Sequence, residues 1–416
     1  MTDTYDLCII GAGPAGFAGA MRAVDLGQHV CLVEGNEIGG TGVMWGALAS
    51  KTMWELAKDF DVAAKVDRGY RAGNLSVDYQ AVRSTVIRAV KEKQYQMLSQ
   101  LETYSRHRWP GPGSVTFIRG KGSFLSQNAV RVTSDDGPTE EIRARHYLVC
   151  TGSKPRWFPN IAVDQTRILD SDGVLSLTQF PSRLVIIGAG IVGTEYATIF
   201  SNFRQTKVYL VDHQERILPF EDEDVSRFVS ENLAQNGVAI FHSTRLRTIR
   251  PQPRHVEVVL DFADGHSEVV ETDAVLISIG RRPNTDGLNL AAAGIQADAA
   301  GYVSCDDKCL VRDNIYAAGD ITHRSALVNV AETEARYAAK AMFGTNVWPL
   351  NYRNMSTVMF FKPAVAAVGL NEQMCRSKGI AYRVAVYSNA LLTRAIAMRS
   401  TDGFVKLIVS RDDRQQ

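Results

Sequence analysis

A glycine-rich pattern occurs twice in this chain, and its repetition constrains the fold more than any other feature of the sequence. The copies are Gly11-Ala-Gly-Pro-Ala-Gly16 and Gly188-Ala-Gly-Ile-Val-Gly193, and each follows a short apolar run and precedes a segment compatible with a helix. The first glycine of such a pattern permits a tight turn, the second lets the backbone approach a pyrophosphate, and the third lets the helix pack closely on the strand. The sequence therefore predicts two nucleotide-binding units of the strand, turn and helix type.

A carboxylate stands at the end of the apolar run that follows each glycine pattern, roughly 20 residues further along the chain. These residues are Glu34 and Asp212. A carboxylate at this place accepts hydrogen bonds from ribose hydroxyls and repels a 2′-phosphate. Asp212 therefore favours NADH, although His213 and Arg216, which follow it closely, leave the use of NADPH open.

Length and charge limit the kinds of partner that the protein can bind. The chain has 416 residues, more than one hydrophobic core usually supports, so two or three domains are expected. Its 46 Lys and Arg residues nearly equal its 45 Asp and Glu residues, which argues against nucleic acid as a partner. No apolar stretch is long enough to cross a bilayer, and the acidic N-terminal segment does not resemble a signal peptide. We therefore expect a cytoplasmic protein without a membrane span.

Six cysteines are scattered along the sequence, and three of them lie in apolar runs typical of buried strands. Free thiols are their expected state. Cys305 and Cys309 are close enough in sequence to suggest redox or metal chemistry, but they flank an Asp-Asp-Lys turn that is expected to be exposed. We expect no metal site.

Hydrophobic periodicity predicts the elements around the two glycine patterns. Helices are expected over residues 50–63 and 194–203, and over a longer stretch that starts at an Asp78 cap and stops before Trp109. Strands are expected over residues 5–10, 29–33, 115–118, 129–132, 140–144, 183–187, 207–211, 274–279 and 402–410. This order predicts an α/β protein with two nested Rossmann-like, three-layer nucleotide-binding domains and a partial C-terminal α+β interface domain.

With these motifs in place, the sequence from Tyr5 to the C-terminus resembles the pyridine nucleotide-disulfide oxidoreductase family, which includes dihydrolipoamide dehydrogenase, mercuric reductase and soluble pyridine nucleotide transhydrogenase. The resemblance implies that FAD binds the first glycine pattern and that NAD(H) or NADP(H) binds the second. It implies an FAD domain at residues 1–154 and 272–347, a nicotinamide nucleotide domain at 155–271 and an interface domain at 348–416. It also implies a homodimer if the C-terminal region is complete.

The resemblance further assigns individual residues to each nucleotide. Those expected to contact FAD are Gly11, Gly13, Gly16, Glu34, Thr41, Lys51, Gly122, Thr151, Gly152, Ser153, Asp320, Ala326, Leu327, Val328 and Asn329. Those expected to line the nicotinamide nucleotide site are Gly188, Gly190, Gly193, Glu195, Asp212 and Gly280. Lys51 aligns with a lysine beside the flavin N5 edge and Glu195 with the glutamate that pairs with it, so both are candidate catalytic residues. The alternative is that both are ordinary helix side chains.

The sequence departs from the family at the redox-active disulfide. The family motif has two cysteines separated by four residues after Gly-Gly-Thr, and the corresponding positions here hold Gly42 and Ala47. The intervening Trp45-Gly46 resembles the same place in soluble transhydrogenase, which retains one of the two cysteines. In addition, no histidine follows His323, so the His-Pro acid–base segment of the family is missing from this sequence. We therefore expect no dithiol relay to a substrate disulfide.

These observations lead to one leading function and two alternatives. The leading hypothesis is an FAD-dependent NAD(P)H oxidoreductase that passes electrons directly to a small-molecule acceptor other than a disulfide, such as a quinone, a dye, oxygen or a second nicotinamide nucleotide. The alternatives are a flavin-bound NADH-sensing or regulatory subunit without turnover, and a disulfide reductase. The strand expected at residues 402–410 has no returning strand after a turn at 411–414, so we also expect the chain to be truncated.

Overall fold

The computed structural model describes residues 4–67, 69, 73–134, 137–344 and 348–411, and it divides into two compact units. The first unit comprises Met1–Thr52, Ala81–Arg156 and Gly280–Tyr352. The second comprises Met53–Gln80, Trp157–Ile279 and Arg353–Gln416. Each unit contains one of the two glycine patterns.

The first unit is built on a six-stranded sheet with strand order β18-β19-β7-β1-β2-β3. Its strands are β1 (Tyr5–Ile10), β2 (His29–Glu34), β3 (Ser114–Arg119), β7 (Ala144–Val149), β18 (Leu310–Arg312) and β19 (Ile315–Ala317). All neighbouring strands are parallel except β18, which runs antiparallel to β19. Helix α1 (Pro14–Asp25) connects β1 to β2, so the first glycine pattern forms the predicted turn between a strand and a helix.

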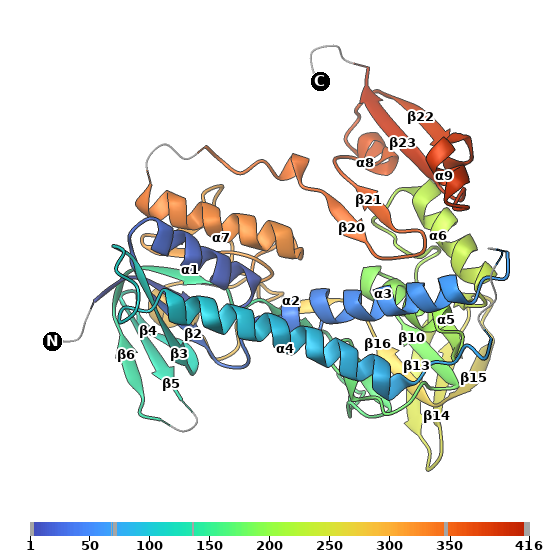
Figure 1. Cartoon of the computed structure of the whole chain (residues 1–416), viewed down its shortest axis with the longest axis horizontal. Helices are drawn as coiled ribbons and strands as arrows, with labels where there is room; N and C mark the ends of the chain where they lie inside the picture. The colour runs from blue at the N-terminus through green and yellow to red at the C-terminus, as the bar shows by residue number, and fades with distance from the viewer. Residues whose placement is uncertain (1–3, 68, 70–72, 135–136, 345–347, 412–416) are drawn as a thin grey trace. The chain divides into compact units, whose positions relative to one another are not determined.

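Two layers cover this sheet. Helices α1 and α7 (Val328–Phe343) lie side by side on one face (Figure 1). Gly19 of α1 permits this close packing, because a Cβ atom there would lie 3.3 Å from Cβ of Ala335 on α7 and 2.9 Å from Cδ2 of Leu148 on β7. The other face meets an antiparallel sheet of β4 (Lys121–Ser126), β5 (Ala129–Thr133) and β6 (Glu140–Ile142). A buried core that includes Ile10 and Phe124 joins the two sheets.

The second unit repeats this three-layer plan on a five-stranded parallel sheet with strand order β12-β11-β10-β16-β9. Its strands are β9 (Ile168–Asp170), β10 (Arg183–Ile187), β11 (Lys207–Val211), β12 (Ala239–Phe241) and β16 (Ala274–Ile277). Helix α5 (Ile191–Asn202) follows β10, and α6 (Glu223–Gln235) follows β11. The antiparallel sheet consists of β13 (Arg245–Pro251), β14 (Val256–Asp261) and β15 (Ser267–Thr272). Val185 of the parallel sheet and Val258 of the antiparallel sheet belong to one buried core, as the internal repeat predicts.

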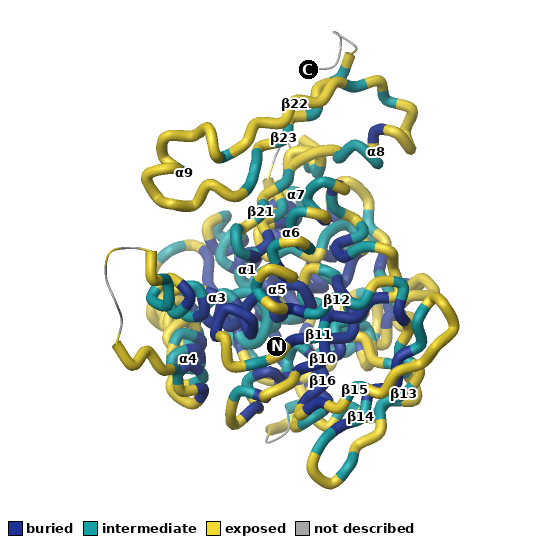
Figure 2. Tube along the Cα trace, turned by 90° about the vertical axis from the view of Figure 1, so that its right-hand side faces the viewer, coloured by how far each residue is buried: buried dark blue, intermediate teal, exposed yellow. Residues whose placement is uncertain are grey.

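The C-terminal part of the second unit contains two short hairpins and two short helices. Its elements are β20 (Thr357–Met359), β21 (Val365–Ala367), α8 (Glu372–Ser377), β22 (Tyr382–Ser388), α9 (Thr393–Ala397) and β23 (Phe404–Ser410). Strands β22 and β23 pair in antiparallel register. Figure 2 shows β22 and α9 as largely exposed, whereas exposed and half-buried residues alternate along β23. The exposed side chains on one face of this hairpin include Val405, Leu407 and Val409. The strand expected at residues 402–410 is β23, whereas the turn expected after it extends beyond Arg411, outside the described residues.

The remaining elements connect these layers. They are α2 (Gly40–Met44), α3 (Ala47–Ala63), α4 (Tyr79–Thr103), β8 (Ser153–Pro155), β17 (Arg281–Pro283) and 3₁₀ turns at Val174–Ser176, Leu290–Ala293, Tyr352–Asn354 and Asn389–Leu391. Within the part of the chain that the structure describes, no helix combines the length and apolar character needed to span a membrane.

The α/β fold class is confirmed, with differences in detail. Helix α5 begins at Ile191, three residues before the expected start, because the glycine turn leads directly into it. The single strand expected over residues 140–144 is instead divided between β6 and β7, which belong to different sheets. Strands β4, β13, β14 and β15 were not expected from the sequence. Charged or small residues interrupt the apolar alternation in β4 and β13, so their periodicity is weak.

Candidate dinucleotide sites

The first glycine turn has the shape that a pyrophosphate requires. Gly11 has a φ of +104°, and a Cβ atom there would lie 2.4 Å from the carbonyl oxygen of Cys150. A Cβ atom at Gly16 would lie 1.8 Å from the carbonyl oxygen of Gly11, so α1 can pack this close only with glycine. In contrast, a Cβ atom at Gly13, the N-cap of α1, would meet no described atom within 4 Å. The helix N-terminus therefore has room for a phosphate where its N–H groups point.

The second glycine turn reproduces this geometry. Gly188 also has a φ of +104°, and its Cβ atom would lie 2.5 Å from the carbonyl oxygen of Ser278. A Cβ atom at Gly193 would lie 1.9 Å from the carbonyl oxygen of Gly188. The space beside Gly190, the N-cap of α5, is again open to 4 Å among the described atoms. Both turns therefore fit a dinucleotide for the same steric reasons.

The two carboxylates predicted to bind ribose also occupy equivalent places. Glu34 accepts a hydrogen bond from the N–H of Ala12 at 2.7 Å, and Asp212 accepts one from the N–H of Ala189 at 2.6 Å. The second oxygen of each accepts from a backbone N–H two residues further on. Burial raises the pKa of Glu34, and the N–H groups of Ala12 and Asn36 partly offset this effect. Each carboxylate therefore stabilises the glycine turn from the end of the adjacent strand.

The cationic residues that follow Asp212 are oriented in different ways. Arg216 donates hydrogen bonds to the carbonyl oxygens of Pro219 at 2.7 Å and Glu221 at 3.0 Å. Its guanidinium group therefore stabilises the loop that follows Arg216. His213 is largely exposed, with Nδ1 3.2 Å from a carboxylate oxygen of Asp212.

Several expected FAD contacts converge in the first unit through hydrogen bonds. Ser153 Oγ donates to a carboxylate oxygen of Asp320 at 2.6 Å. Arg281 donates from Nε to Ser153 Oγ at 2.8 Å, and from Nη2 to the Ser153 carbonyl oxygen and to Thr41 Oγ1. Thr151 exchanges hydrogen bonds with Asn284, which fixes the turn containing Gly152. Arg281 was not among the residues assigned to FAD from the sequence, although it links Ser153 to Thr41.

Other residues assigned to FAD occupy less connected places. Gly122 lies on β4, where a Cβ atom would be 3.0 Å from Cγ2 of Ile10. Ala326 precedes α7, Leu327 is its N-cap, and Val328 and Asn329 form its first turn. Gly280, assigned to the nicotinamide nucleotide site, has a φ of +100° and a carbonyl oxygen that accepts from the N–H of Arg156 at 2.9 Å.

The two candidate catalytic residues belong to different units, so their expected ion pair stays a prediction. Lys51 lies on α3, and its ammonium donates to Ser50 Oγ at 3.3 Å. Glu195 lies on α5 and is buried, and one of its oxygens accepts a hydrogen bond from the N–H of Phe360 at 3.0 Å. This contact joins residues that are far apart in the chain, so no local sequence pattern predicts it.

The structure leaves no space for a side chain at the first cysteine position of the family motif. A Cβ atom at Gly42 would lie 2.3 Å from Cγ and 3.1 Å from Cδ of Pro14, and 3.4 Å from Cγ2 of Val328. Because Pro14 is a rigid ring at the start of α1, it cannot swing away as a flexible side chain would. A thiol at position 42 therefore requires the backbone of α1 or α2 to move.

The chain's own cysteines lie elsewhere. All six fall within the described residues and are free thiols, and five of them are buried. Burial raises the pKa of Cys150 and raises that of Cys305 to about 11. Cys150 and Cys305 are therefore protonated near neutral pH and are poor nucleophiles.

Comparison with known proteins agrees with this geometry. Residues 5–335 match the family model described as pyridine nucleotide-disulphide oxidoreductase, and residues 355–415 match the dimerisation domain of the same family. Dihydrolipoyl dehydrogenase of Bacillus subtilis (strain 168) is 32% identical over 411 residues, which cover 98% of this chain and 84% of the relative. The enzyme of the same name from Geobacillus stearothermophilus is 31% identical over 407 residues, covering 97% of this chain and 84% of the relative.

Solved structures extend the similarity to the backbone. LpdA from Mycobacterium tuberculosis has a TM-score of 0.87 at 27% identity, with 98% of this chain and 87% of that chain covered. RclA from Escherichia coli, described as an HOCl-induced flavoprotein disulfide reductase, has a TM-score of 0.85 at 26% identity, with 99% and 87% covered. The two glycine turns, the three-layer units and these matches agree: the chain belongs to the pyridine nucleotide-disulphide oxidoreductase family, whose members are flavoenzymes that use FAD and NAD(P)H.

Proposed function

We propose that this protein oxidises NADH and passes the electrons to a small-molecule acceptor other than a disulfide. Candidate acceptors are quinones, dyes, oxygen and a second nicotinamide nucleotide. When bound, FAD supplies a ring that can accept a hydride from the nicotinamide and pass the electrons on to the acceptor. The observation that carries the proposal is that a Cβ atom at Gly42, the first cysteine position of the family motif, would lie 2.3 Å from Cγ of Pro14.

A disulfide reductase needs a thiolate that attacks a disulfide sulfur and a second thiol that resolves the mixed disulfide. The family resemblance puts these thiols at positions 42 and 47, where this chain has glycine and alanine. The names of the relatives favour a disulfide acceptor. The residues of this chain support the opposite choice, because neither position carries sulfur and burial raises the pKa of the Cys150 thiol, which disfavours its thiolate.

We assign FAD to residues 1–154 and 272–347, and the nicotinamide nucleotide to residues 155–271. In this assignment Gly13 and its neighbours bind the pyrophosphate of FAD, Glu34 binds the adenosine ribose, and Asp320 binds the ribityl chain. Ser153 and Arg281 hold Asp320 in place through the hydrogen bonds described above. Lys51, paired with Glu195, would supply a positive charge beside the flavin, which would stabilise the negative charge of the reduced ring.

We further propose that the preferred reductant is NADH rather than NADPH. Asp212 occupies the place where a 2′-phosphate would lie, and a carboxylate repels that group. The guanidinium group of Arg216 is held by the carbonyl oxygens of Pro219 and Glu221, so the nearest arginine in the sequence does not offset the repulsion.

The test is an anaerobic reduction followed by an acceptor screen on the purified, FAD-loaded protein. NADH is expected to bleach the flavin absorbance without the long-wavelength band that a thiolate beside flavin produces. A quinone, a redox dye, oxygen and a nicotinamide nucleotide analogue are then added separately, with lipoamide and glutathione disulfide as the disulfide acceptors. At least one of the first group is expected to restore the absorbance at least tenfold faster than either disulfide.

Each other outcome points to a different function. Faster reoxidation by lipoamide would establish a disulfide reductase and overturn the proposal. Bleaching that no acceptor reverses would indicate a sensor without turnover. A matched pair of variants on α3 tests the role of the lysine, because Lys51→Met is expected to slow reduction by NADH at least tenfold whereas Lys58→Met, which removes an exposed lysine, is expected to leave it unchanged.

A further inference from the structure

The loop that carries Asp320 is held in a narrow space between two helices. Gly319, the residue before Asp320, has a φ of +78°. A Cβ atom there would lie 3.1 Å from Cβ of Ala331 on α7 and 3.5 Å from Cβ of Ala15 on α1. Strand β19 has ended at Ala317, so the backbone of Gly319 no longer bonds within the sheet. Its N–H group therefore needs an acceptor from outside the sheet.

Glu334 provides that acceptor. One carboxylate oxygen of Glu334 accepts a hydrogen bond from the Gly319 N–H at 2.7 Å. Glu334 lies on α7, one turn after Ala331, and only 1% of its surface is exposed. Because water does not reach this carboxylate, removing it would leave the Gly319 N–H buried without a partner.

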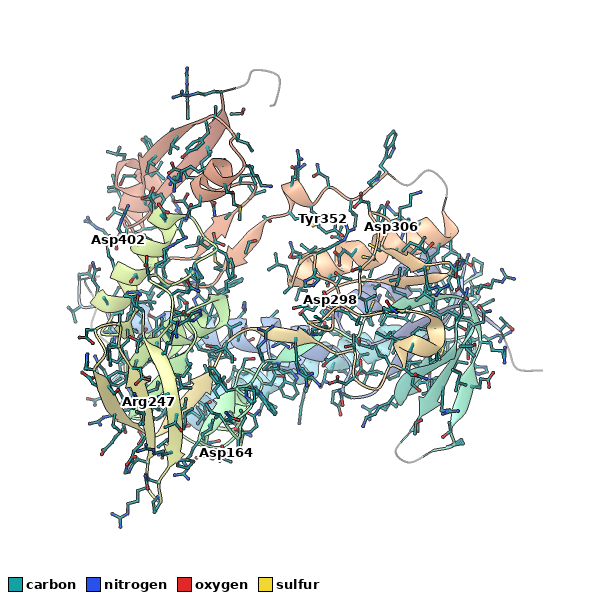
Figure 3. All side chains as sticks on the ribbon, turned by 180° about the vertical axis from the view of Figure 1, so that it is seen from behind. Asp164, Arg247, Asp298, Asp306, Tyr352 and Asp402 are labelled. Carbon is teal, nitrogen blue, oxygen red and sulfur yellow. The ribbon has the colours of Figure 1, made fainter. Side chains whose placement is uncertain are left out.

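The other oxygen of Glu334 is also occupied. It accepts a hydrogen bond from the hydroxyl of Tyr352 at 2.8 Å, and Tyr352 is labelled in Figure 3. The guanidinium carbon of Arg324 lies 4.9 Å from the centre of the Tyr352 ring, and Arg324 also donates to the carbonyl oxygen of Cys305 at 2.9 Å. The orientation of Glu334 is therefore fixed from both sides.

We propose that Glu334 is a positioning residue that holds the peptide before Asp320 so that the Asp320 carboxylate faces the ribityl chain of FAD. Ser153 restrains the same carboxylate directly, at 2.6 Å, whereas Glu334 acts one residue upstream through the backbone. The inference rests on the assignment of Asp320 to FAD. It does not depend on the identity of the electron acceptor.

The test measures how fast FAD leaves the purified holoprotein, followed by the increase in flavin fluorescence after dilution. Glu334→Ala removes the acceptor of the Gly319 N–H, and FAD release is expected to be at least tenfold faster. Glu334→Gln keeps an oxygen for Gly319, and its amide nitrogen can donate to the Tyr352 hydroxyl, so release is expected to stay within threefold of the unmodified rate. The flavin midpoint potential and visible spectrum should change in Glu334→Ala and return in Glu334→Gln.

Two further variants act as controls. Glu332→Ala removes a carboxylate from the same helix that pairs with Arg336 at the surface, and FAD release is expected to be unchanged. If Glu334→Ala does not fold, Tyr352→Phe removes one restraint on Glu334 with little change of shape, and a two- to fivefold faster release is expected.

The outcomes separate the positioning role from the assignment of Asp320. Equal release rates in Glu334→Ala and Glu332→Ala would overturn the inference, provided that Asp320→Ala releases FAD quickly. Slow release from Asp320→Ala would instead show that Asp320 does not hold FAD. Release from Glu334→Gln as fast as from Glu334→Ala would mean that charge, rather than the hydrogen bond to Gly319, is what matters.

Discussion

Gly42 lacks the thiol that the family has at this position, and its surroundings also leave no room for a side chain. In a helix, alanine is ordinarily more stable than glycine by about 1 kcal/mol. Here the Cβ atom of alanine would collide with the ring of Pro14, 2.3 Å away. Overpacking of this kind costs roughly 1–3 kcal/mol, so the collision should outweigh the helix propensity.

We therefore expect Gly42→Ala to lower the free energy of unfolding by about 1–2 kcal/mol, measured by denaturant titration. When Pro14 is first replaced by alanine, adding Gly42→Ala should cost much less stability than it does in the unmodified protein, because the ring that it would collide with is absent. Gly73→Ala is the matched control, because a Cβ atom there meets no described atom within 4 Å, and it is expected to be neutral or stabilising. A stabilising Gly42→Ala would contradict the account of this position.

Nucleotide preference is the second property that single residues determine. We expect kcat/KM for NADH to exceed that for NADPH by at least tenfold. Asp212→Ala should lower this ratio about tenfold, a change of about 1.4 kcal/mol. The N–H of Ala189 loses its acceptor in Asp212→Ala, so the variant is expected to bind both nucleotides more weakly. The ratio of the two kcat/KM values cancels this shared effect and reports the preference alone. Arg216→Ala should leave the ratio unchanged, and a fall in NADPH activity alone would indicate that Arg216 binds the 2′-phosphate.

At the residue scale, local sequence patterns predicted the positions whose roles are local. Gly16 and Glu34 make their contacts within the first strand, turn and helix, so their spacing in the sequence is enough to predict them. Arg281 and Glu334 could not be predicted in this way. Arg281 reaches Thr41, which is 240 residues away in the sequence, and only the folded sheet brings the two together.

At the scale of elements, one buried lysine joins three segments of the second unit. The side chain of Lys406 on β23 is 7% exposed, and its ammonium lies 2.7 Å from carboxylate oxygens of Asp222 and Asp224 at the start of α6. It also pairs with Glu372, the first residue of α8. The ammonium therefore neutralises a group of carboxylates that would otherwise repel one another.

We expect Lys406→Met to lower the free energy of unfolding by about 3 kcal/mol at pH 7, because Asp222 and Glu372 lose this cation and Asp224 keeps only its pair with Arg227. The hydrogen bond from Lys406 is the largest cause that lowers the pKa of Asp224 and of Glu372. A lowered carboxyl pKa stabilises the folded state above the unfolded pKa of about 4, and this contribution disappears as the pH falls. The difference between the variant and the unmodified protein should therefore shrink from pH 7 to pH 3.

Lys378→Met, which removes an exposed lysine at the end of α8, serves as the control and should change stability by less than 0.5 kcal/mol, the usual range for surface substitutions. A loss in Lys406→Met that is the same at both pH values would mean that packing, rather than charge, explains it.

Elements were predicted best where a single periodicity dominates. The parallel strands β1, β2, β10 and β11 are continuous apolar runs, and all four were expected. The antiparallel layers are formed by strands with one buried and one exposed face. Charged residues on the exposed face, such as Arg245 and Arg247, weaken the hydrophobic periodicity of these strands. These layers depend on contacts with the parallel sheets, which no local window of sequence contains.

At the scale of the whole molecule, the exposed face of the β22 and β23 hairpin belongs to the matched dimerisation domain. Leu407 lies in the middle of this face and is 59% exposed. If a second copy covers the face, Leu407→Glu should weaken the dimer at least tenfold in sedimentation velocity experiments. Replacing Arg383, a charged neighbour on the same face, with lysine should have little effect. An unchanged dimer in Leu407→Glu would show that this face lies outside the interface.

The central claim is that electrons leave this protein without passing through a cysteine pair, and native alkylation tests it most directly. The FAD-loaded protein is treated with iodoacetamide under native conditions, the extent of modification is measured by mass spectrometry, and NADH oxidation is followed with a quinone and with lipoamide. Since positions 42 and 47 carry no sulfur, we expect the quinone rate to stay within twofold of the untreated rate and lipoamide turnover to be negligible before and after treatment. Rapid lipoamide reduction that alkylation abolishes would contradict the account.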